Sequence, residues 1–284
     1  MASGNLARTL NTETMLRNHL CERIQAQISV ARTLCILHPK QAKAWAAPIE
    51  RAESIMTAAA PVGTADLHAA VHHAEEALAP LASTARSYTL YCVGHAHIDM
   101  NWQWSWPETV AVTHDSFATV LKLMNEFPDF RFSQSQASVY RIMEQHNPTM
   151  LEAIAERVRE GRWEVTASHW VEGDKNIVSG ESLTRHLLYT RQYMHQLFDL
   201  DPEDVPIDWA PDTFGHAVTM PTYLKQGGVK YLYLHRPGTR VPNPPRAFRW
   251  RAPDGSEILV KNDMECGYNG QITPAVADHL FRFS

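Results

Sequence analysis

Two short segments carry side chains whose types and spacing suit metal-assisted chemistry. The first places His95, His97 and Asp99 at alternate positions, directly after an apolar run. Because alternate side chains of an extended strand point to the same side, both imidazoles and the carboxylate are expected to share one face. Imidazole nitrogens and carboxylate oxygens are ligands that suit a divalent ion such as Zn²⁺. The alternative is a hydrogen-bonded pair of histidines in the core.

The second segment runs from Trp209 to His216 and holds Asp212 between an apolar strand and a Phe-Gly turn. A carboxylate on such a constrained and partly desolvated backbone is a candidate metal ligand, a candidate nucleophile, or both. The alternative is that Asp212 only caps the turn.

From Tyr88 onward, short β-rich runs alternate with helical runs, and this alternation predicts an α/β sheet with parallel strands. The expected strands are 89–93, 131–133, 163–166, 206–210, 230–234, 248–250 and 257–260. The last two strands are expected to be joined by a hairpin turn at Asp254-Gly255. The helices expected between strands are 108–127, 150–160, 181–198 and 221–226.

Polar side chains directly follow six of these strands, and they favour His, Asp, Trp and Gln over the Lys, Glu, Ser and Gly of solvated loops. In a parallel α/β barrel, the carboxyl ends of all strands open on one face. One site lined from every strand is therefore expected on that face. The residues are His95, His97, Asp99, Gln134, Ser135, Gln136, Ser168, His169, Glu172, Asp174, Asp212, Thr213, His216, His235, Arg236, Asn262, Asp263 and Glu265.

Residues 1–86 differ from the rest of the chain, because they are rich in Ala and Leu and helical in period. Six side chains share one face of the first helix: Leu16, Leu20, Ile24, Ile28, Ala31 and Cys35. His38-Pro39 ends that helix, and two more are expected at 41–60 and 64–81, the last with Thr64 as its N-cap. A helical segment, 1–86, therefore precedes an α/β domain, 87–284, and is expected to form a hairpin or small bundle.

Composition excludes several classes of protein. The 284 residues carry 31 acidic and 26 Lys or Arg side chains, and the net charge of −5 gives no basic field for nucleic acid. No run approaches the roughly 18 apolar residues that span a membrane. The first residues lack the regions of a signal peptide, so a cytoplasmic protein is expected. Buried free thiols are expected at the four cysteines, Cys21, Cys35, Cys92 and Cys266.

Together the two segments resemble glycoside hydrolase family 38, the α-mannosidases. The resemblance covers about residues 90–236 and rests on His-Ala-His-Ile-Asp-Met-Asn-Trp, on Trp-Ala-Pro-Asp-Thr-Phe-Gly-His, and on 163–182 between them. It implies an α/β fold with a seven-stranded β/α barrel, which this chain carries incompletely. It also implies one Zn²⁺ per site and retaining hydrolysis of terminal α-D-mannosyl residues of oligosaccharides or glycans.

The same resemblance implies a role for each matching residue. His97 and Asp99 would be the first two zinc ligands, and Asp212 would be both the third ligand and the nucleophile. Other matching residues would bind the sugar or support the ligands: Trp102 and Phe214 as aromatic wall and floor, Arg236 beside the nucleophile, Asp174 and Tyr268 in the pocket lining, and His95 and His216 behind the ligands.

The fourth zinc ligand and the acid/base carboxylate of the family are expected beyond residue 284. The chain is therefore interpreted as an N-terminal portion of an α-mannosidase with weak or absent activity alone, and the full-length protein is expected to be a homo-oligomer. Two alternatives stay open. One is a different metal-dependent barrel hydrolase, such as a deacetylase-like enzyme. The other is a non-catalytic zinc-binding or sugar-binding remnant.

Overall fold

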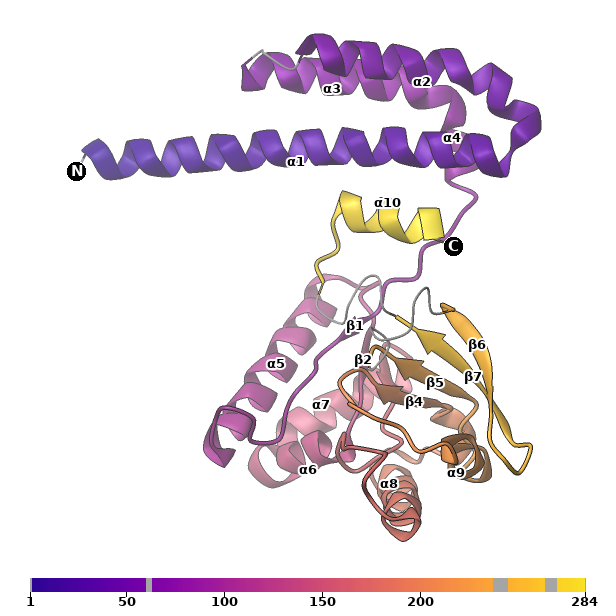
Figure 1. Cartoon of the computed structure of the whole chain (residues 1–284). Coiled ribbons are helices and arrows are strands. Elements are labelled where there is room, and N and C mark those ends of the chain that lie inside the picture. Colours follow the sequence, from indigo (N-terminus) through magenta and orange to yellow (C-terminus); the bar gives the residue numbers. More distant parts are fainter. Residues whose placement is uncertain (1, 60–62, 237–244, 264–269, 284) are drawn as a thin grey trace. The chain divides into compact units, whose positions relative to one another are not determined.

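The computed structural model groups the chain into two compact units (Figure 1). The helical unit comprises Met1–Tyr91 and Gln271–Ser284, and the α/β unit comprises Cys92–Gly270. The structure describes residues 2–59, 63–236, 245–263 and 270–283. The domain division predicted at residue 86 stays a prediction, and the contacts add the C-terminal segment to the helical unit.

The helical unit packs its helices around an apolar core that includes Leu20, Ile24, Trp45 and Val71. Its elements are α1 (Ala2–Leu37), α2 (Pro39–Ala59), α3 (Thr64–Leu78), η1 (Ala79–Leu81), α4 (Ala82–Ala85) and α10 (Pro274–Phe283). The helix boundary predicted at His38-Pro39 is confirmed. The predicted N-cap is wrong by one residue, because Gly63 has the extended backbone of the cap and Thr64 is already helical.

The α/β unit contains two sheets within the described residues (Figure 1). The first has the order β1 (Gly94–His95), β2 (Phe132–Gln134) and β3 (Trp163–Val165), all parallel. The second has the order β4 (Ile207–Ala210), β5 (Tyr231–Leu234), β7 (Glu257–Asn262) and β6 (Ala247–Arg251). Strand β6 alone runs antiparallel, in the predicted hairpin with β7. The α/β class is confirmed, whereas a single seven-stranded barrel is not.

The buried strand predicted at residues 89–93 is wrong. These residues are exposed, with Tyr91 at 88% of its possible surface, and pairing begins only at Gly94. The physical reason is the extent of strand pairing, because β2 pairs with β1 only at Gly94 and His95 and does not pair with residues 89–93. Apolar side chains without a neighbouring ladder do not make a strand.

Helices of the α/β unit pack against both sheets. They are α5 (Trp106–Glu126), α6 (Ala137–His146), α7 (Pro148–Arg159), α8 (Gly180–Phe198) and α9 (Met220–Gln226). Helices α5, α6 and α7 contribute to the core at the first sheet, α9 packs against the second, and α8 contributes to both cores. Trp163 of β3 is the centre of the core at the first sheet, since its ring lies 5.1 Å from that of Phe117 and its Nε1 donates to the Tyr140 hydroxyl at 3.0 Å. Among the described residues, no helix has the length and apolar character needed to cross a membrane.

The loop after β3 is fixed to the segment after β4 by buried polar contacts. Lys175 pairs its backbone with the region of His216, donating to the Gly215 carbonyl and accepting from the Ala217 N–H. The Lys175 ammonium also donates two hydrogen bonds, of 2.8 and 2.6 Å, to the fully buried carboxylate of Asp208 in β4. This contact brings the residues before Lys175 alongside those that follow β4.

Candidate metal centre

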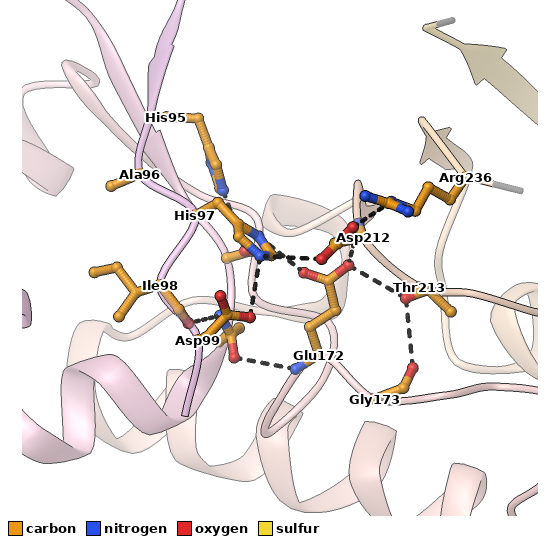
Figure 2. Close-up of polar contacts among 12 residues, drawn as sticks. His95, Ala96, His97, Ile98, Asp99, Glu172, Gly173, Asp212, Thr213 and Arg236 are labelled. Atoms are coloured by element: carbon orange, nitrogen blue, oxygen red, sulfur yellow. Dashed lines mark hydrogen bonds and ion pairs between the residues drawn. The ribbon is translucent and has the colours of Figure 1, made fainter. Parts of the chain in front are cut away.

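Three predicted ligands converge after strands β1 and β4 (Figure 2). His97 Nε2 lies 3.3 Å from Asp99 Oδ1 and 3.8 Å from Asp212 Oδ2. One potential ligand atom of each residue lies within 4.8 Å of the others, and no second such group is found in the described part of the chain. One nitrogen and two carboxylate oxygens at this spacing fit a single divalent ion, and their chemistry is that of zinc ligands.

Two buried glutamines hold the ligand segment after it leaves β1. Gln134 Nε2 donates to the Ala96 carbonyl at 3.0 Å, and Gln136 Nε2 donates to the Ile98 carbonyl at 2.8 Å. Both glutamines lie at the end of β2 or directly after it. Their side-chain hydrogen bonds take the place of the β1–β2 backbone pairing, which ends at His95. The backbone around His97 is therefore fixed on both sides without belonging to a strand.

Glu172 joins the site although the sequence singled it out only as one of many polar residues. Its Oε1 accepts from the Asp212 N–H at 2.7 Å and from the Thr213 hydroxyl at 3.2 Å. Its Oε2 lies 3.3 Å from His97 Nδ1, and the side chain is 8% exposed. The available signal was its place after β3, which does not distinguish it from its neighbours.

The carboxylates change the electrostatics of His97. Burial lowers the pKa of this imidazole, but the neighbouring Glu172, helped by the two aspartates of the cluster, raises it above its ordinary value overall. Several carboxylates around one imidazole make a strongly anionic site. Such a site gains favourable Coulomb energy from a bound cation.

Arg236 contacts the other oxygen of the Asp212 carboxylate. Its Nε forms an ion pair with Asp212 Oδ1 (Figure 2). Its guanidinium carbon lies 5.1 Å from the centre of the Phe214 ring. The nucleophile candidate is therefore held between a cation and the potential ligand His97.

A cavity of about 310 Å³ opens at the cluster. Its lining contains His97, Asp99, Trp102, Asp174, Glu172, Asp212 and Phe214. Trp102 and Phe214 are 64% and 65% exposed, so aromatic surface is available to a ligand. One carboxylate oxygen of Asp174 accepts a hydrogen bond from the Asn176 N–H of the same loop, at 2.8 Å.

A larger cavity, of about 550 Å³, lies within the helical unit, without a metal-ligand cluster among its described residues.

The two remaining predicted histidines, His95 and His216, are partly buried. His95 lies with its ring nitrogens 3.4 Å from the hydroxyls of Ser133 and Ser135, and burial with the nearby His97 lowers its pKa to about 3. Burial, aided by Lys175, lowers the pKa of His216 to about 4. Both imidazoles are therefore neutral near pH 7.

Tyr268, predicted to line the pocket, lies outside the described residues, as does Cys266.

Cys21, Cys35 and Cys92 are free thiols. Cys92 was predicted to be buried, but it is exposed. It lies in the region that the sequence wrongly assigned to a buried strand.

The fold and the cluster define an α/β protein with a candidate metal site at the carboxyl ends of its strands. Residues 87–278 match the family described as the glycosyl hydrolases family 38 N-terminal domain, and the chain belongs to this family. The resemblance predicted from the two motifs is thereby confirmed.

Relatives and solved structures agree with this assignment. The chain is 33% identical over 184 residues to alpha-mannosidase G of Dictyostelium discoideum and 31% identical over 175 residues to alpha-mannosidase 2C1 of Homo sapiens. These alignments cover 64% and 61% of this chain but only 17% and 16% of the relatives. An alpha-mannosidase structure from Enterococcus faecalis V583 is similar in fold, with a TM-score of 0.56, 20% identity, and coverage of 67% of this chain and 22% of that chain.

Proposed function

We propose that this chain supplies the metal-binding and nucleophile side of a zinc-dependent retaining α-mannosidase, acting on terminal α-D-mannosyl residues of oligosaccharides or glycans. The observation that carries the proposal is the meeting of His97, Asp99 and Asp212 within 4.8 Å at a cavity with exposed aromatic walls. The names of the relatives support the substrate class, since they are called alpha-mannosidases.

Each residue has a chemical task in this proposal. Asp212 attacks the anomeric carbon while the bond to the leaving oxygen breaks, and water later cleaves the resulting glycosyl ester. Arg236 holds the attacking carboxylate in an ion pair. Trp102 and Phe214 pack on the apolar CH face of the sugar. A Zn²⁺ ion on the cluster, when bound, supplies positive charge for sugar oxygens.

The leaving oxygen needs a proton from a second carboxyl group, roughly 5–5.5 Å from the nucleophile in retaining enzymes. The described residues leave this acid unassigned, as they leave a fourth zinc ligand. We also propose that the two sheets belong to one β/α barrel. Two features support it. Four of the five strand pairs among the described residues are parallel, and the Lys175–His216 bridge joins the segment after β3 of the first sheet to the segment after β4 of the second.

Hydrolysis of an activated aryl α-mannoside by the purified protein, with and without a chelator, tests the proposal. We expect weak or no turnover from this chain alone, and zinc-dependent turnover from a chain extended to the length of the relatives. In that longer chain, the Asp212→Ala substitution should abolish turnover together with much of the zinc binding. Turnover that survives in Asp212→Ala would favour a different metal-dependent hydrolase. Zinc or mannose binding that never leads to turnover, even in a chain extended to the length of the relatives, would favour a non-catalytic remnant.

A further inference from the structure

Glu172 connects the two separate segments that carry the candidate ligands. One segment follows β1 and contains His97, and the other follows β4 and contains Asp212. These strands belong to different sheets. Glu172 comes from the loop after β3 and contacts both segments at once, through one carboxylate oxygen each (Figure 2).

The orientation of these contacts separates Glu172 from the ligands themselves. Its Oε2 faces Nδ1 of His97, whereas Asp99 and Asp212 face Nε2 of the same ring. The carboxylate of Glu172 is thus on the side of the imidazole away from the place where an ion would bind. Its other oxygen is already occupied by the Asp212 N–H and the Thr213 hydroxyl.

Glu172 is itself fixed through the backbone. Its N–H donates to Gln136 Oε1 at 3.1 Å, and the amide of that glutamine donates to the Ile98 carbonyl. Together with the 3.3 Å contact between Glu172 Oε2 and His97 Nδ1, these two hydrogen bonds link Ile98, Gln136, Glu172 and His97 in a closed loop of contacts. The carboxylate therefore cannot turn away from the imidazole without breaking contacts on both sides of it.

We propose that Glu172 is the positioning residue of the metal centre: it keeps the proton of His97 on Nδ1, turns Nε2 toward the ion, and ties the Asp212 backbone into the same arrangement. The inference rests on the proposed zinc site. A carboxylate behind a ligating imidazole fixes its tautomer and its orientation, and loss of such a partner commonly reduces metal affinity 10- to 100-fold.

The Glu172→Gln variant tests this assignment, because its amide keeps one acceptor for Asp212 N–H and turns an N–H₂ donor toward Nδ1. A donor there favours the opposite tautomer of His97, with the proton on Nε2 where the ion should bind. We expect the zinc affinity, measured by competition with a chelator, to fall about 10- to 100-fold. We also expect ¹⁵N NMR of the metal-free protein, above the His97 titration, to show the Nδ1-protonated form in the wild type and not in the variant.

Two control variants separate positioning from general damage. Glu181→Gln removes a surface charge paired with Arg185 and should leave zinc affinity and tautomer unchanged. Thr213→Val removes a neighbouring hydrogen bond to Glu172 without altering the contact with His97, so the tautomer should stay as in the wild type.

Wild-type zinc affinity and an unchanged His97 tautomer in Glu172→Gln would overturn the assignment. If the variant does not fold, the His97 tautomer of the wild type is itself the test. Protonation on Nε2 contradicts the proposal, and protonation on Nδ1 supports it. Failure of the proposed function looks different: a wild type that binds no zinc at all, whatever its tautomer.

Discussion

Lys175 and Asp208 form a buried ion pair that joins the loop after β3 to strand β4. The lysine is 2% exposed and the aspartate is fully buried, and the carboxylate also accepts from the Ser168 hydroxyl at 2.9 Å. Because water does not reach either charge, each depends on the other for stabilisation. The loop fixed in this way carries Glu172, so the ion pair indirectly sets the geometry of the candidate metal centre.

Asp208→Asn is expected to destabilise the α/β unit by about 3–5 kcal/mol, because it leaves the Lys175 ammonium buried without a counter-charge. Urea unfolding followed by tryptophan fluorescence measures the change. The double variant Lys175→Met with Asp208→Asn is the control, and it should recover part of the loss. An Asp208→Asn protein within about 1 kcal/mol of the wild type would contradict this view of the pair.

His216 is expected to make stability depend on pH. Its pKa is about 4 in the folded protein and 6.5 as a free side chain, so the unfolded chain takes up the proton first as the pH falls. The free energy of unfolding should therefore decrease from pH 6.5 down to about 4, by roughly 3 kcal/mol in total from this residue.

Comparison of the wild type with His216→Gln by urea unfolding at several pH values isolates this contribution, since other histidines are common to both proteins. The variant should show the smaller loss of stability between pH 6.5 and 4. Parallel pH curves for the two proteins would show that His216 is not held neutral by burial.

Trp102→Ala is expected to weaken mannose binding by about 2- to 10-fold, which corresponds to the 0.5–1.5 kcal/mol of a specific aromatic contact. Isothermal titration with methyl α-mannoside measures it. Trp106→Ala removes another exposed indole, one absent from the cavity lining, and should leave the affinity unchanged. Equal losses in both variants, or none in Trp102→Ala, would contradict the assigned sugar wall.

Local sequence patterns predicted the parts of the fold that local forces determine. The strands at 163–166 and 206–210 were located within a residue or so, because apolar β-branched and aromatic runs ended by polar residues have few other solutions. Strand positions predicted the segments that carry the candidate ligands, and the resemblance to family 38 selected His97, Asp99 and Asp212 among their polar residues.

What the sequence did not predict depends on distant partners. Helix α6 was missed because Ala137–His146 follows β2 with no turn signal to mark its start, and Gln136 at its N-cap has the unusual φ of 65°. Glu172 was not selected because its role requires His97 and Asp212, and the latter is 40 residues away. The false strand at 89–93 failed for the same reason, since only a partner strand makes an apolar run into a ladder.

Zinc stoichiometry of the purified chain tests the central claim most directly. Elemental analysis after dialysis should find one zinc per chain in the wild type and a substantial loss in each of His97→Ala, Asp99→Ala and Asp212→Ala, with folding checked by circular dichroism. Glu181→Gln should retain the metal. A wild type without zinc, or folded ligand variants that keep all of it, would contradict a metal centre at this cluster.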